Sequence, residues 1–145
     1  MVRRMATKEE LVQTVKGIVK HWRDGQLDVA YQGYRDLFSS PEFGQHRPED
    51  QRSALRLMIM AKGAPNPDRP TEPMIEAHRA AVSPLTDLVS NHGDPADHEM
   101  LGVCHVVLGN MESASAIFRA GLAIERQRNP QSDLCGSLMK RISLI

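Results

Sequence analysis

The sequence predicts an all-α protein, and three observations support this fold class. Aromatic residues make up only 4% of the chain, and β-branched residues rarely alternate with polar ones as they do in strands. Apolar residues recur instead at spacings of three and four, the period of an amphipathic helix. Glycine, proline and capping residues divide the chain into segments of helical length. We therefore expect helices packed as antiparallel pairs.

The chain has the size of a single domain, spanning 1–145. A protein of 145 residues buries a core without needing disulfides or metal ions. Cys104 and Cys135 lie within apolar helical patterns, outside any CxxC or Cys/His spacing, and are predicted to be core residues in a reducing compartment. We find no apolar run near the roughly 20 residues of a membrane span and no signal-peptide pattern. We therefore expect a cytoplasmic protein.

The first predicted helix pair spans 8–38. Thr7 and Glu10 form a T-x-x-E capping box, which predicts a helix over about 8–23. Gly25 ends this helix, because glycine adopts the left-handed conformation that closes many helices. A second helix is predicted from about residue 27 to 38. The first helix carries a wide apolar stripe made of Leu11, Val12, Val15, Ile18, Val19 and Trp22.

The second predicted pair spans 48–91 and contains an insertion. Its first helix is expected to run from Pro48 to Lys62 and to end at Gly63. The insertion, 64–73, is predicted to be a loop because its prolines remove backbone donors and block a helix. Its second helix is expected over about 72–90.

A proline within the second helix of this pair complicates the prediction. Pro84 lacks the N–H that a helix interior requires. We therefore expect either a kink at this point or a new helix start with Ser83 as its cap.

The third predicted pair spans 95–128 and is followed by a last helix. Asp94 and Pro95 supply an N-cap and a first-turn proline. Gly109 marks the turn between the two helices. The segment 132–143 is predicted to be a capping helix, with Leu134, Leu138 and Ile142 on one face.

An internal repeat connects the first and third pairs, because shifting the sequence by 84 residues aligns them. The shift places His21 on His105, Gly25 on Gly109, Leu27 on Met111, Ala30 on Ala114, Tyr34 on Phe118 and Arg35 on Arg119. Each pair thus has a turn glycine, an alanine five residues later and an aromatic residue four further on. In the middle pair, Gly63 and Ala80 align with the glycine and alanine, and Pro84 takes the aromatic position.

This pattern resembles the tetratricopeptide repeat (TPR) in a degenerate array of three units. The resemblance implies a right-handed superhelix whose first helices line a concave groove for a peptide or partner protein. Carried over to this sequence, the groove is expected to contain eight partner-binding residues. They are Val15, Val19, Trp22, Arg23, Leu57, Met60, Val103 and Val106.

These groove residues have a second interpretation. The valines are equally consistent with core packing, and Trp22 either anchors an interface, as large aromatics often do, or fills the junction with the second pair. Val15 and Val19 stand where some TPR domains hold a partner's C-terminal carboxylate with Lys and Asn, so that mode of binding is not expected. An apolar groove is more similar to that of three-unit chaperones of bacterial secretion systems.

Catalytic and polyanion-binding functions are disfavoured. The chain has 18 basic and 18 acidic residues, so we expect neither nucleic acid nor membrane as a partner. We find no GxSxG motif, phosphate-binding glycine loop or Cys/His dyad, and predict that the protein is not an enzyme. His92 and His98 lie near acidic residues but lack a metal-ligand spacing. We therefore expect no metal ion and no cofactor.

Two functions remain from the sequence. The first is a non-catalytic adaptor or chaperone-like module that binds a partner in the apolar groove. The second is a structural or regulatory subunit of a homo- or hetero-oligomer, which the apolar tail from Ile142 to Ile145 favours.

Overall fold

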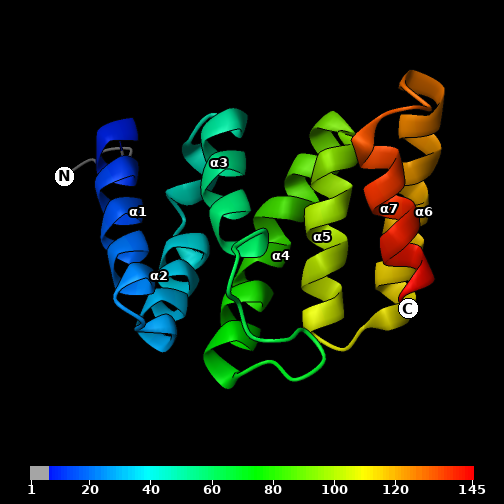
Figure 1. Ribbon diagram of the computed structural model, residues 1–145. Helices are drawn as coiled ribbons and strands as arrows, with labels where there is room; N and C mark the ends of the chain where they lie inside the picture. The colour runs from blue at the N-terminus through cyan, green and yellow to red at the C-terminus, as the bar shows by residue number, and fades with distance from the viewer. Residues whose placement is uncertain (1–6) are drawn as a thin grey trace.

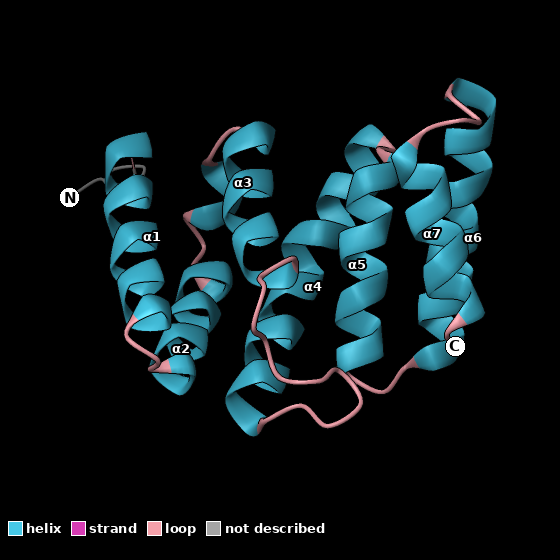
Figure 2. Cartoon of the chain, in the orientation of Figure 1, coloured by secondary structure: helices cyan, strands magenta, loops and turns pink. Residues whose placement is uncertain are grey.

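The computed structural model describes residues 7–145, and within this range the chain is helical with no strand, which confirms the all-α class (Figure 2). The α-helices are α1 (Lys8–Arg23), α2 (Leu27–Ser39), α3 (Pro48–Ile59), α4 (Glu72–His92), α5 (Pro95–Val107), α6 (Met111–Arg128) and α7 (Asp133–Ser143). A short 3₁₀ helix, η1 (Phe43–Gln45), precedes α3 and was not expected from the sequence.

The helices form an elongated array in chain order, with α1 at one end and α6 and α7 at the other (Figure 1). The main contacts join α1 to α2, α2 to α4, α4 to α5, α5 to α6 and α6 to α7, so packing links only near neighbours in sequence. The larger apolar core is built from α1 to α5, and a smaller one from α5 to α7. Ile59 packs against both. Such near-neighbour packing is typical of helical repeat architectures.

The predicted helix starts are stabilised by the predicted capping side chains. The Thr7 hydroxyl accepts a hydrogen bond from the Glu10 N–H at 3.1 Å, and the Asp94 carboxylate accepts one from Ala96 at 2.9 Å. Ser132 caps α7 in the same way. Each cap satisfies a backbone donor that the first helical turn leaves without a partner.

The two repeat-related turns have the same backbone geometry. Gly25 has a φ of 79°, its N–H donates to the Trp22 carbonyl at 3.1 Å, and the Gln26 N–H donates to the His21 carbonyl at 2.9 Å. This pair of bonds is a Schellman motif. The turn at Gly109 has the same φ and the two equivalent bonds, at 3.0 and 2.8 Å. The repeat seen in the sequence therefore corresponds to a structural repeat.

Small residues allow the helices of each outer pair to approach closely. Ala30 and Ala114 are completely buried, and the aromatic residues one turn later, Tyr34 and Phe118, are also buried. In the third pair, a Cβ added to Gly102 would lie 2.2 Å from Cε1 of Phe118. The Phe118 ring thus occupies the space that a side chain at position 102 would need.

The middle pair differs from its predicted form. Helix α3 ends at Ile59 rather than Lys62, and Gly63 has a left-handed φ of 81° within the loop beyond the helix. A residue before a proline avoids the helical backbone conformation, so Ala64 and the prolines that follow it prevent α3 from continuing through this segment. The loop ends earlier than expected, because Thr71 caps α4 and residues 72 and 73 are helical.

Burial in α4 differs from the predicted repeat at the alanine position. Ala80 is only half-buried, whereas Ala81 is completely buried. Pro84 and Leu85, about one turn later, are both buried. Helix α4 continues through Pro84 without a restart, so Ser83 caps no helix. Burial of the flanking residues offsets the roughly 3 kcal/mol that an interior proline costs.

We predict opposite effects for two glycine-to-alanine substitutions. Gly102→Ala should lower the free energy of unfolding by about 1–3 kcal/mol because it overpacks the α5–α6 contact. Gly17→Ala, in α1, has no neighbour within 4 Å of the added Cβ and should raise it by about 0.5–1 kcal/mol. Urea unfolding of both variants measures the difference. Equal effects would contradict the close packing described here.

A pH dependence is predicted from His78, which is buried in α4. Burial lowers its pKa from the ordinary value of 6.5, and its Nδ1 lies 2.8 Å from the Met74 carbonyl. As the pH falls below 6.5, the unfolded chain gains a proton that the folded protein resists, so stability decreases. Urea unfolding between about pH 7.5 and about pH 5.5 should show this loss, with a shallower slope for His78→Asn. An unchanged slope would assign the effect to other groups, such as His105, whose pKa burial also lowers.

Candidate interaction surface

Exposed apolar side chains gather at two hollows in the described part of the chain. Seven large apolar residues are exposed there, and five of them line these hollows. The first hollow, of about 260 Å³, lies between α1 and α3. Its lining residues are Lys8, Leu11, Val12, Val15, Asp50, Ser53, Ala54 and Leu57. Lys8 and Asp50 form an ion pair of 3.7 Å within this lining.

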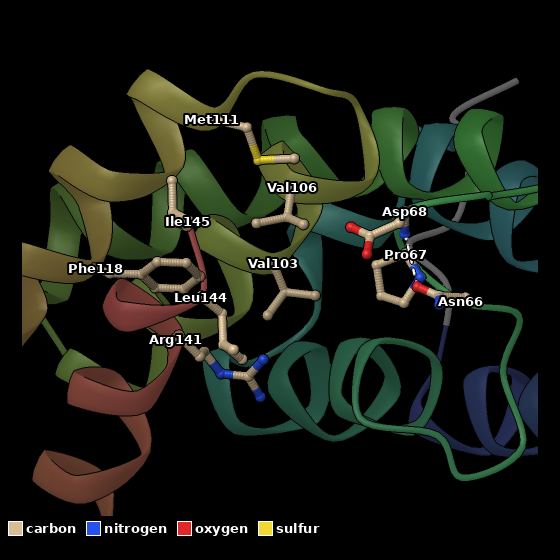
Figure 3. A pocket seen from close by; sticks show the side chains of 10 residues that line it. All are labelled: Asn66, Pro67, Asp68, Val103, Val106, Met111, Phe118, Arg141, Leu144 and Ile145. Carbon is tan, nitrogen blue, oxygen red and sulfur yellow. Dashed lines mark hydrogen bonds between the residues drawn. The ribbon is translucent and has the colours of Figure 1, made fainter.

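The second hollow, of about 290 Å³, lies between the α3–α4 loop and α5 to α7 (Figure 3). Its lining residues are Asn66, Pro67, Asp68, Val103, Val106, Met111, Phe118, Arg141, Leu144 and Ile145. The loop forms one side, and the ends of α6 and α7 form the other (Figure 3). The exposed residues Met111, Leu144 and Ile145 surround it.

The structure distributes the eight predicted groove residues over several environments. Val15 and Leu57 line the first hollow, whereas Val103 and Val106 line the second. Met60 lines neither hollow, and its sulfur lies 3.7 Å from Nη2 of Arg141. Val103 is buried beneath the second hollow, and Leu57 is 48% exposed. Leu57 is therefore the most exposed of the apolar residues predicted for the groove.

The remaining predicted residues, all on α1, line neither hollow. Trp22 is half-buried and packs edge-on against Tyr31, with ring centroids 5.4 Å apart. Val19 is half-buried and Arg23 is exposed. Trp22 therefore packs within the first pair, and Tyr31 in turn lies against His78 of α4, with ring centroids 6.0 Å apart.

Sequence reasoning missed the α3–α4 loop and the end of α7 as parts of the second hollow. The prolines predicted that residues 64–73 form a loop, but they did not indicate where it lies. The apolar C-terminal residues indicate an assembly surface in the sequence, but their position beside Val106 depends on how α7 packs on α6. The sequence did not indicate that Arg141 belongs to the second hollow, because no motif near it predicts a contact with α5.

Two ion pairs join α5 to α3 and to α7, and in both the carboxylate is buried while the guanidinium reaches solvent. Arg52 contacts both carboxylate oxygens of Asp97 at 3.0 Å, joining α3 to α5. The Asp97 side chain is 0% exposed and that of Arg52 is 26% exposed. Arg141 donates to Glu99 at 2.8 Å, with side chains 33% and 9% exposed. Burial raises the pKa of Asp97, and Arg52 opposes this shift.

The polar groups considered as catalytic or metal sites have structural partners. Within residues 7–145, no group of three or more His, Cys, Asp or Glu side chains is placed to hold a metal ion. Nδ1 of His98 lies 2.8 Å from the Asp94 carbonyl, and Asp97 is paired with Arg52. Cys104 is buried, and burial raises the pKa of its thiol, which disfavours the reactive thiolate.

None of the helices α1 to α7 has the length and apolar character needed to cross a bilayer. Comparison with known proteins found no matching family, no similar curated protein and no similar solved structure. The function of this surface therefore has to be argued from its own geometry.

We predict that the Arg52–Asp97 pair is a strong link between α3 and α5. Arg52→Ala should lower the free energy of unfolding by about 3–5 kcal/mol, because it leaves a buried carboxylate without its partner. The double variant Arg52→Ala, Asp97→Ala should be more stable than Arg52→Ala alone, because it removes that carboxylate. Urea unfolding of Arg52→Ala, Asp97→Ala and the double variant provides the test. If the loss of unfolding free energy in the double variant equals the sum of the two single losses, the two groups do not interact.

Proposed function

We propose that this protein is a non-catalytic interaction module that binds a segment of a partner protein across the two hollows. The observation that carries the proposal is the gathering of five exposed apolar residues at those hollows. Apolar side chains scattered singly over a surface are ordinary, whereas clustered ones rimmed by polar groups mark interaction sites. The ion pairs beside the hollows supply such a polar boundary.

The proposal includes a TPR-like arrangement, with α1–α2, α3–α4 and α5–α6 as the three pairs and α7 as a capping helix. The identical turns at Gly25 and Gly109 support it. The distribution of the hollows also supports it, because the first lies between the first helices of two pairs, α1 and α3. The second contains residues of α5, the first helix of the third pair.

The energetics suggest how such a partner is held. Each hollow has room for a large apolar side chain, whose burial contributes about 1.5–3 kcal/mol. Association and ordering of the bound segment cost several kcal/mol. Two anchors alone therefore give weak binding, and the groups between the hollows determine whether a partner binds well. Both cysteines are free and buried, which suits our proposal that the protein acts in the cytoplasm.

The test uses paired surface variants in affinity capture from lysate of the native host. Leu57→Glu and Leu144→Glu place a charge in the first and second hollows, at residues that are 48% and 76% exposed. Because both side chains are exposed, the variants should stay folded. We expect each to lose at least about tenfold of the captured partner, since a buried unpaired carboxylate is costly.

The matched controls are Val29→Glu and Met139→Glu, which change similarly exposed apolar residues on α2 and α7 that line neither hollow. They should capture the partner as well as the unchanged protein. Circular dichroism confirms that all four variants are folded. Equal capture by all variants would reject the proposed surface.

A second candidate is a structural or regulatory subunit of an oligomer. Leu144, Ile145 and Met139 are exposed at the end of the array where α7 lies, and a second copy would cover them. Analytical ultracentrifugation tests this alternative. A concentration-dependent dimer that Met139→Glu and Leu144→Glu abolish, and that Leu57→Glu leaves intact, would favour it over partner binding.

A further inference from the structure

The ion pairs Arg52–Asp97 and Arg141–Glu99 present mainly their cationic ends to solvent. In each pair the carboxylate, from Asp97 or Glu99, is at most 9% exposed, while the arginine is exposed by 26% or more. Asp97 and Glu99 belong to α5, and the arginines reach them from α3 and α7. The outer surface of these contacts therefore consists of guanidinium groups.

Each of these arginines keeps hydrogen-bond donors that its partner does not use. A guanidinium has five N–H donors. Arg52 meets Asp97 through Nε and Nη2, and Arg141 meets Glu99 through Nε and Met60 through Nη2. Among residues 7–145, Nη1 of neither arginine has a partner. The remaining capacity suits an incoming oxygen acceptor.

A third arginine adds uncompensated charge at the same place. Arg56 is exposed, with no ion pair to any described residue. It lies one turn after Arg52 on α3 and four residues before Met60, the residue that caps the end of this helix. Residues spaced by four share a face of a helix, so Arg56 lies on the α3 face that carries the contacts to Asp97 and Arg141. We call Arg52, Arg56 and Arg141 the guanidinium seam. Arg56 directly precedes Leu57 of the first hollow, and Arg141 lines the second hollow, so the seam extends from one hollow towards the other.

From this arrangement we infer that the partner segment carries carboxylates between two apolar side chains. The apolar side chains enter the two hollows, and Asp or Glu side chains between them accept hydrogen bonds from the guanidinium seam. Arginine recognises planar carboxylates through paired, charge-assisted hydrogen bonds, which are about twice as strong as neutral ones. The inference deepens the proposed function and rests on it.

The spacing of the segment follows from helix geometry. Adjacent packed helices lie about 8–10 Å apart, so the two hollows are separated by roughly 15–20 Å. An extended chain advances about 3.3 Å per residue. The two apolar side chains should therefore lie roughly five or six residues apart, with the acidic residues between them.

The surrounding charges favour a protein segment over a polyanion. Arg52 and Arg141 are each neutralised by a buried carboxylate, which leaves Arg56 as the uncompensated cation of the seam. Asp68, in the second hollow, would repel a continuous row of phosphates. Nucleic acid binding depends on many cations acting together, whereas one or two carboxylates require only this short seam.

The test is a selection from an mRNA-displayed library of random linear peptides of about 12 residues. The baits are the unchanged protein, Arg56→Glu, Leu57→Glu and Val29→Glu. Arg56 is chosen because, unlike Arg52 and Arg141, its replacement leaves no buried carboxylate without a partner. We expect the unchanged protein and Val29→Glu to enrich peptides with Asp or Glu between two apolar residues. Arg56→Glu should lose that acidic preference or favour Lys and Arg.

The outcomes separate the inference from the function on which it rests. Apolar peptides that are lost with Leu57→Glu but show no acidic preference would overturn the inference and leave the proposed function standing. No enrichment with the unchanged protein beyond that with Leu57→Glu would overturn both. Enrichment of basic or uncharged polar residues between the apolar positions would also overturn the inference.

A quantitative measurement follows on a selected peptide. Fluorescence anisotropy should show at least about tenfold weaker binding to Arg56→Glu, and intermediate binding to Arg56→Lys, which keeps the charge but loses the planar donors. Replacing the acidic residues of the peptide with Gln and Asn should weaken binding to the unchanged protein and have little effect with Arg56→Glu. Equal losses with both proteins would place the carboxylates away from Arg56 and overturn the inference.

Discussion

The interaction on which the candidate surface depends is the ion pair between Arg52 and Asp97. Helix α3 has only limited contact with α4, its neighbour in sequence, because a loop of residues 60–71 separates them. Its position is set by buried residues such as Leu55 and by the attachment of Arg52 to the buried carboxylate on α5. Since α3 forms one wall of the first hollow and carries most of the guanidinium seam, this pair fixes both features.

The same arrangement explains why a buried charge is retained here. Removing one member of a buried pair is costly, but replacing both with apolar residues is often neutral, so stability alone does not require the pair. An apolar contact would hold α3 against α5 without presenting donors to solvent. The observed pairs join the helices and also keep guanidinium groups between two apolar hollows. Glu99 and Arg141 form a second ion pair of this kind between α5 and α7, and Ser137 also donates a hydrogen bond to Glu99.

The two outer helix pairs are well described by local rules, and the middle pair is not. The turns at Gly25 and Gly109 require a left-handed residue, and the caps at Thr7 and Asp94 require a side-chain acceptor, so their sequences identify them directly. In the middle pair the repeat signal is weaker, because Ala81 rather than Ala80 is the fully buried alanine and a proline, Pro84, stands in the buried position of the aromatic residue. The insertion at 64–73 changes the number of residues between Gly63 and α4, so the spacing of the outer pairs no longer identifies the equivalent positions in α4.

By itself, the sequence determined the helical class, the approximate ends of the helices and the caps at Thr7 and Asp94, because each depends on residues within a turn or two of one another. It also showed the repeat at an offset of 84, because the turn and packing residues of each pair form the same local pattern. It also indicated Val15, Leu57, Val103 and Val106, which line the two hollows. Tertiary structure alone decided that Trp22 packs on Tyr31, that the loop at Pro67 borders the second hollow, and that Arg52 and Arg141 reach α5. These contacts join residues distant in sequence, and periodicity within a helix carries no information about which distant side chain its exposed arginines will meet.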